Sequence, residues 1–133
     1  MESPEFHPKT IVVIGTGYVG LPAAVLLARA GHKVIGVDID ENIVQAINEG
    51  ILRVTEDELQ KIMDEPEVRR NLKAQATPCE ADAFLIAVPT PLEKRKKLAD
   101  LSIVTEATKS IVPFLREGNL VILESTVPPL TCR

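Results

Sequence analysis

The sequence predicts an α/β protein with a doubly wound, mostly parallel sheet. Short β-branched runs that end at turn residues alternate along the chain with longer segments of helical pattern. The composition is aliphatic, since 45% of the residues are hydrophobic and only 3% are aromatic. Such a composition suits strands that are buried between two layers of helices. At 133 residues, the chain is long enough for one domain with its own core.

The first third of the chain has a strand-helix-strand pattern. Residues 10–14 are an apolar, β-branched run, which predicts a buried strand. Residues 18–30 have a helical pattern, and Gly31 is placed to end that helix. Residues 33–37 form the next strand, which Asp38 closes. A connection of this kind requires the two strands to run parallel.

Three helices and a short edge strand are predicted in the middle of the chain. Asp40 can cap the first helix, and the sequence Thr55-Glu56-Asp57-Glu58 has the form of a capping box that begins the second. Pro66 interrupts the pattern, so the remaining helical residues form one or two turns of their own. The predicted ranges are 40–50, 55–64 and 67–72 for the helices and 73–77 for the strand.

Two strands flank one helix in the last third of the chain. Residues 83–88 form a buried strand, which the prolines of residues 89–91 stop because proline cannot donate to a ladder. A charged loop over residues 92–100 ends on an aspartate that can cap a helix over residues 101–115. Residues 120–124 form the final strand.

The turn between the first strand and the first helix has the spacing G-x-G-x-x-G. It lies within VIGTGYVGLP, and Asp38 follows eighteen residues after the last glycine, at the end of the next strand. In the dinucleotide-binding fingerprint Gly15 makes the tight turn, Gly17 lets the backbone approach a pyrophosphate, and Gly20 allows close helix-strand packing. The helix N-terminus then offers N–H groups to the phosphates. A turn that needs glycine only for its own geometry is the alternative.

Asp38 is placed to accept hydrogen bonds from the ribose hydroxyls of the adenosine half. A 2′-phosphate would be repelled by its carboxylate, so the expected cofactor is NAD and not NADP. The alternative for Asp38 is a turn residue at a strand end. Asp40, two residues on, is better explained as a helix N-cap than as a ligand.

Two proline-rich loops follow strands at the same edge of the predicted sheet. They read AVPTPL over residues 87–92 and LESTVPP over residues 123–129. Ligands of open parallel sheets bind at the carboxyl ends of the strands, where these loops lie. Thr90, Ser125 and Thr126 offer hydroxyls there, and ordinary turn chemistry explains them equally well.

The motifs GTGYVGLP, GVDID, AVPTP, ADLS and VILESTVPP, in this order and spacing, resemble the N-terminal domain of the UDP-sugar dehydrogenases over residues 9–129. Within that family the form is nearest to the UDP-N-acetylmannosamine dehydrogenase branch, with UDP-glucose dehydrogenase a close cousin. The resemblance implies a Rossmann-type NAD-binding domain of an oxidoreductase in nucleotide-sugar metabolism and polysaccharide biosynthesis. Such enzymes oxidise the C6 alcohol of a UDP-hexose to the carboxylate with two NAD, through a cysteine thioester, and are homodimers or larger.

The resemblance also implies which residues bind the cofactor. Glu124 is a candidate general base beside the junction of cofactor and substrate, with a structural hydrogen bond as the alternative. No metal site is expected. The implied cofactor-binding residues are Gly15, Thr16, Gly17, Tyr18, Val19, Gly20, Asp38, Val88, Pro89, Thr90, Ser125 and Thr126.

The sequence departs from the family pattern near its end. Neither Cys79 nor Cys132 lies in the family's catalytic cysteine motif, and VPP is followed by LTCR where the family has glycine and threonine. We therefore expect residues 9–133 to be a C-terminally truncated NAD-binding domain that binds NAD but does not complete the reaction alone. Residues 1–8 begin with an acidic segment that has no apolar run, and we expect them to be a disordered leader or an expression remnant.

Other functions fit the sequence less well. The net charge of −4 argues against a nucleic-acid binder, and no apolar run could span a membrane. No secretory signal is seen, and the two cysteines have no metal-ligand spacing, so a cytoplasmic location is expected. The basic residues 94–97 could attract phosphates or form a solvated loop. Two alternatives lack the VPTP and ESTVPP loops: a regulatory NAD-sensing module, and the cofactor domain of a 6-phosphogluconate or 3-hydroxyacid dehydrogenase.

Overall fold

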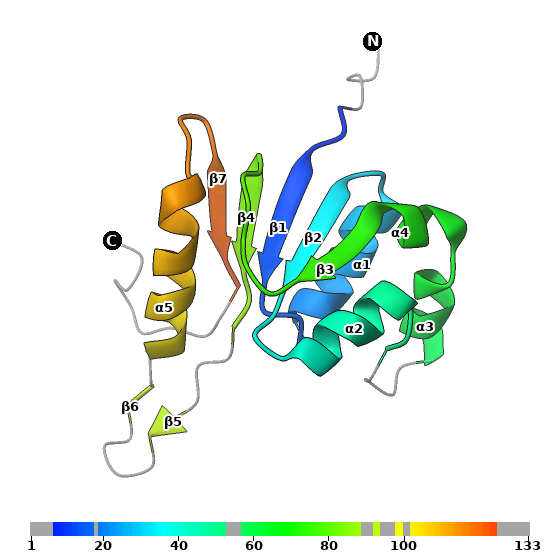
Figure 1. Cartoon of the computed structure of the whole chain (residues 1–133), viewed down its shortest axis with the longest axis horizontal. Coiled ribbons are helices and arrows are strands. Elements are labelled where there is room, and N and C mark those ends of the chain that lie inside the picture. Colours follow the sequence, from blue (N-terminus) through cyan, green and yellow to red (C-terminus); the bar gives the residue numbers. More distant parts are fainter. Residues whose placement is uncertain are drawn as a thin grey trace.

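The computed structural model of the protein describes residues 7–17, 19–52, 57–88, 92–93, 98–99 and 102–124. Five parallel strands form one sheet in the order β3-β2-β1-β4-β7, with helices on both faces (Figure 1). This doubly wound α/β arrangement confirms the predicted fold class. The elements are β1 (Thr10–Ile14), α1 (Gly20–Arg29), β2 (Lys33–Val37), α2 (Glu41–Glu49), α3 (Asp57–Met63), α4 (Pro66–Asn71), β3 (Leu72–Gln75), β4 (Ala83–Ile86), β5 (Leu92–Glu93), β6 (Leu98–Ala99), α5 (Ser102–Ile111), the 3-10 turn η1 (Val112–Phe114) and β7 (Leu120–Leu123).

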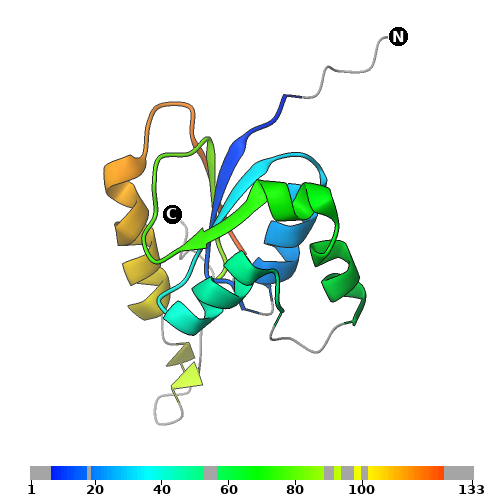
Figure 2. The ribbon, with the colours of Figure 1, turned by 45° about the vertical axis from the view of Figure 1, so that its right-hand side comes forward.

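The central strand β1 divides the core into two layers. Ile11 and Val13 face one side, where they pack with buried residues of α1, α2, α3 and α4. Val12 and Ile14 face the other side and pack with α5. Figure 2 shows the same division, with α5 alone on one face of the sheet. The strict alternation of a pleated strand therefore produces both layers from one five-residue run.

Most predicted elements are confirmed where local signals are strong. The strands β1 and β2 have the predicted bounds. The Asp40 side chain accepts a hydrogen bond of 2.9 Å from the Asn42 N–H and so caps α2, which ends at Gly50 with φ of 80°. Pro66 begins α4 at a position where its missing N–H has no cost. Thr55 and Glu56 of the predicted capping box lie outside the described residues, whereas Asp57 and Glu58 begin α3.

Several predicted segments differ from the structure in their bounds. The strand predicted over residues 73–77 is β3 over Leu72–Gln75, and the helix predicted over residues 67–72 is α4 over Pro66–Asn71. The strand β4 ends at Ile86, two residues early, although Ala87 and Val88 stay buried. The helix α5 ends at Ile111, because Pro113 has no N–H for the next helical hydrogen bond, and a 3-10 turn follows. The stretch predicted as a charged loop contains the short antiparallel pair β5 and β6.

The two edge strands of the sheet differ in their surroundings. At the β3 edge, the Asn48 side chain of α2 donates to the Ala74 carbonyl at 3.0 Å and accepts from the Ala74 N–H at 2.8 Å. These are the two bonds that a neighbouring strand would make, so the amide blocks the edge. At the other edge, Leu120, Val121 and Ile122 of β7 are all more than 40% exposed. The aliphatic composition predicts a sheet that helices cover on both faces, and in the described part of the chain β7 is covered less than the other strands.

Replacing Asn48 by alanine should lower the free energy of unfolding by about 1–3 kcal/mol, because both polar groups of the buried Ala74 lose their partner. Chemical denaturation measures this. Gln45→Ala is the matched control, since Gln45 lies on the same helix and bonds only Glu49 among the described contacts. We expect the control to change stability by less than about 0.5 kcal/mol. Equal losses in the two variants would contradict the edge-blocking role.

Candidate cofactor site

The glycine turn begins at the end of β1, between the ends of two neighbouring strands. The Gly15 N–H donates to the Val37 carbonyl of β2 at 2.8 Å. Gly15 has φ of 90°, and a Cβ at this position would lie 2.8 Å from the Ala87 carbonyl oxygen. Only glycine fits this backbone without strain. Gly15 therefore makes the tight turn that the fingerprint assigns to its first glycine.

The other two glycines of the motif differ in what the protein demands of them. A Cβ at Gly20 would lie 1.8 Å from the Gly15 carbonyl oxygen, so close packing of α1 on the turn requires glycine. A Cβ at Gly17 would meet no described atom within 4 Å, and Gly17 has no positive φ. The described part of the fold gives no steric reason for glycine at position 17. Open space at this residue, in front of a helix, fits the close approach of a bound phosphate group.

The N-terminus of α1 follows directly on this open space. Val19 occupies the N-cap position, where its side chain accepts no hydrogen bond, and the first turn contains no acidic residue. The Leu21 and Ala23 N–H groups donate within the turn, to Gly17 and Val19. A ten-residue helix carries a partial positive charge at this end. The electrostatics of the turn therefore favour an anion.

Asp38, just beyond β2, lies next to the glycine turn. Its Oδ2 accepts hydrogen bonds from the Thr16 N–H at 3.1 Å and from the Thr16 hydroxyl at 2.9 Å. Its Oδ1 accepts from the Asp40 N–H at 2.9 Å. The carboxylate is half-buried and firmly held. Two features that the sequence places twenty-two residues apart are thus joined by direct contacts.

The remaining predicted site residues lie at the same edge of the sheet or outside the described residues. The Ala87 N–H donates to the Ile14 carbonyl, and the Glu124 N–H donates to the Ile86 carbonyl, each at 2.8 Å. Val88 and Glu124 therefore follow β4 and β7 at the edge where the glycine turn lies. Val88 is buried and Glu124 is exposed. The predicted residues Tyr18, Pro89, Thr90, Ser125 and Thr126, and the basic residues 94–97, lie outside the described residues.

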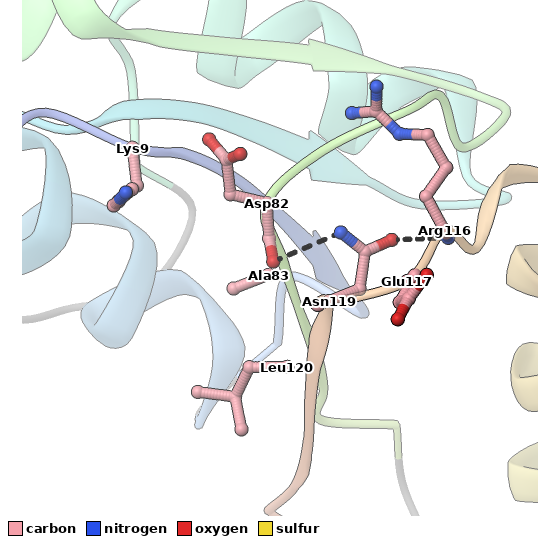
Figure 3. Close-up of a pocket in the computed structure, with 8 residues that line it drawn as sticks. Lys9, Asp82, Ala83, Arg116, Glu117, Asn119 and Leu120 are labelled. Atoms are coloured by element: carbon pink, nitrogen blue, oxygen red, sulfur yellow. Dashed lines mark hydrogen bonds between the residues drawn. The ribbon is translucent and has the colours of Figure 1, made fainter.

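A hollow of about 500 Å³ lies at the opposite edge of the sheet, at the amino ends of β1, β4 and β7 (Figure 3). The polar side chains Asp82 and Asn119 that line it make hydrogen bonds to backbone groups. Asn119 donates to the Ala81 carbonyl at 2.9 Å and accepts from the Arg116 N–H at 2.7 Å, and Asp82 accepts from the Thr10 N–H at 2.8 Å. Ligands of open parallel sheets bind at the carboxyl ends instead. We therefore assign the candidate site to the glycine turn and not to this hollow.

Neither a metal site nor an activated thiol is found in the part of the chain that the structure describes. No cluster of three or more histidine, cysteine, aspartate or glutamate residues is arranged to hold a metal ion there. Burial raises the pKa of the Cys79 thiol, with the nearby Lys33 acting in the opposite direction. A protonated thiol is a poor nucleophile. Among the described helices, none has the length and apolar content to cross a membrane.

The fold and this site together define a Rossmann-type dinucleotide-binding domain. The chain belongs to the UDP-glucose/GDP-mannose dehydrogenase family, whose NAD binding domain matches residues 9–133. NAD is the cofactor of this domain, as the sequence predicted. The resemblance to the nucleotide-sugar dehydrogenases is thereby confirmed, and neither alternative class finds support.

Several named relatives share this part of their sequence with the chain. It is 44% identical over 128 residues to the UDP-N-acetyl-D-mannosamine dehydrogenase of Methanococcus maripaludis strain C7, covering 94% of this chain and 30% of the relative. It is 47% identical over 119 residues to the UDP-N-acetyl-D-mannosamine dehydrogenase of Escherichia coli K12, and the match covers 90% of this chain and 28% of the relative. The structure of the UDP-N-acetyl-mannosamine dehydrogenase Cap5O from Staphylococcus aureus superimposes on this chain with a TM-score of 0.87 at 39% sequence identity. The match covers 92% of this chain and 30% of the Cap5O chain. The chain thus spans about 30% of the length of these relatives.

Proposed function

We propose that the chain holds NAD for a UDP-sugar 6-dehydrogenase, with UDP-N-acetylmannosamine as the sugar substrate. The cofactor part of this proposal rests on the contact between Asp38 and the glycine turn. This contact fixes a carboxylate beside the N-terminus of α1. The relatives at about 45% identity that bear the name of the mannosamine enzyme support the choice of sugar. NAD held in this turn would supply the hydride acceptor, with one NAD consumed in each of the two oxidation steps at C6 of the sugar.

Each part of the turn has a role in this proposal. The pyrophosphate lies against Gly17 and the N-terminus of α1, where open space and the helix dipole favour it. The Asp38 carboxylate accepts a hydrogen bond from a ribose hydroxyl of the adenosine half, and its negative charge repels a 2′-phosphate. From the resemblance to the family, we propose that Tyr18 and Val19 also contact the phosphates, and that the residues contacting the nicotinamide half are Val88, Pro89, Thr90, Ser125 and Thr126.

Sugar binding and the chemistry at C6 need more than these residues. The chain spans about 30% of the length of its relatives, and its one described cysteine has a raised pKa. We propose that residues 1–133 alone bind NAD but do not oxidise the sugar. Glu124 stays a candidate for proton transfer, since it follows β7 at the cofactor edge and its side chain is exposed.

A domain exchange tests the proposed activity. Residues 9–133 would replace the matching segment of the Escherichia coli relative, and NADH absorbance would be followed with UDP-N-acetylmannosamine and with UDP-glucose. We expect NADH formation with the first sugar, as in the unaltered relative, and none from the chain alone. A chimera that binds NAD and folds but oxidises neither sugar would contradict the proposal. Oxidation of either sugar by residues 1–133 alone would contradict the proposal that this chain binds NAD but does not oxidise the sugar.

A further inference from the structure

We propose that Thr16 is a positioning residue: it holds the Asp38 carboxylate in one orientation and thereby sets the selectivity of the site for NAD over NADP. This inference rests on the proposed function, because Asp38 acts on a dinucleotide only if the turn binds one. Its basis is a pair of hydrogen bonds to a single atom. Both the Thr16 N–H, at 3.1 Å, and the Thr16 hydroxyl, at 2.9 Å, donate to Asp38 Oδ2.

The Thr16 side chain is confined by the fold. Thr16 is 3% exposed and is the one buried polar residue in the described part of the chain. Its methyl group faces β2 at Gly36, where an added Cβ would lie 3.0 Å from Thr16 Cγ2. Glycine at position 36 therefore gives the threonine its space. Since the side chain is buried and bonded to Asp38, we infer that it acts through Asp38 and not by touching the cofactor.

The contacts to Asp38 leave a definite acceptor position. A carboxylate offers about four lone-pair positions, two on each oxygen. Thr16 fills both on Oδ2, and the Asp40 N–H fills one on Oδ1. Among the described residues no other group donates to Oδ1, so one position there is available for a ribose hydroxyl.

The same contacts determine how the site treats a 2′-phosphate. A carboxylate held by three hydrogen bonds cannot swing aside, so its negative charge stays where it repels the phosphate. Releasing one of these bonds should therefore weaken NAD binding and relax the rejection of NADP.

Two substitutions at Thr16 separate this role from a purely structural one. Thr16→Val keeps the shape but removes the hydroxyl, whereas Thr16→Ser keeps the hydroxyl. Calorimetric titration of each full chain would give the dissociation constants of NAD and NADP, and thermal melting would confirm that each variant is folded. We expect Thr16→Val to weaken NAD binding about three- to tenfold, because the freed Asp38 side chain must then be ordered when NAD binds. NADP binding should weaken less, so the NADP-to-NAD ratio of dissociation constants falls. Thr16→Ser should keep the wild-type ratio.

A double-mutant cycle with Asp38 completes the test. In an Asp38→Ala background, Thr16→Val should have no further effect on NAD binding, because Thr16 acts through that carboxylate. An undiminished effect in that background, or an equal loss of NAD and NADP affinity in Thr16→Val, would overturn the positioning role alone. A folded wild-type chain that binds neither dinucleotide would overturn the proposed function as well. The two failures are therefore distinguishable.

Discussion

Gly20→Ala should destabilise the protein by about 3 kcal/mol or more, because the new methyl group would overlap backbone that cannot move away. The Cβ would lie 1.8 Å from the Gly15 carbonyl oxygen and 2.9 Å from its carbonyl carbon. The overlap can be removed only if α1 moves away from the turn. This movement would disturb the core packing of the helix's buried residues, among them Leu21, Ala24, Val25 and Ala28. Denaturant unfolding followed by circular dichroism measures the loss.

Gly17→Ala is the matched control for that substitution. It adds the same methyl group to the same turn, but no described atom lies within 4 Å of the new Cβ. We expect the stability to change by less than about 0.5 kcal/mol, whereas NAD binding should be strongly weakened because the methyl group stands where the pyrophosphate approaches. A Gly17→Ala variant that unfolds like Gly20→Ala, or that binds NAD as tightly as the wild type, would contradict the assigned roles of the two glycines.

Asp38→Ala should weaken NAD binding about 10- to 100-fold, the range that corresponds to losing a hydrogen bond to a charged group. The same change should leave NADP binding equal or stronger, because it removes the negative charge that repels a 2′-phosphate. Titration calorimetry with the two dinucleotides measures both effects. The selectivity for NAD should therefore disappear in this variant.

Asp40→Ala is the control for the Asp38 substitution. It removes a carboxylate two residues away and the N-cap bond of 2.9 Å to Asn42, while the backbone N–H that holds Asp38 stays. Loss of this cap should lower stability by about 1 kcal/mol, with no change in the preference between NAD and NADP. A loss of selectivity in Asp40→Ala that matches the loss in Asp38→Ala would show that general acidity of the region, and not Asp38, governs the choice.

Much of the fold could be predicted because its signals are local. The strands β1 and β2 are short apolar runs bounded by turn residues, and their limits agree with the prediction residue by residue. The cap at Asp40 needs only a side chain and an N–H two residues on. The end of α5 was predicted too late, because the helical pattern continues to residue 115 whereas the helix ends at Ile111, before Pro113.

The missed features depend on contacts between distant parts of the chain. Asn48 has the appearance of a solvent-facing helix residue, and its partner Ala74 lies twenty-six residues further on. Thr16 was predicted to bind the cofactor as a variable residue of the glycine motif, and its contacts with Asp38 and Gly36 appear only when β1 and β2 are paired. Hydrophobic patterns also cannot show that β7 lies at an edge, because its sequence is as apolar as that of a central strand.

The most direct test of the central claim is calorimetric titration of the wild-type chain with NAD and with NADP under identical conditions. The claim is that the turn from Gly15 to Gly20, together with Asp38, forms an NAD site. It predicts binding of one NAD per chain and a clearly weaker response to NADP. A folded chain that binds neither dinucleotide, or that binds NADP as tightly as NAD, would contradict it.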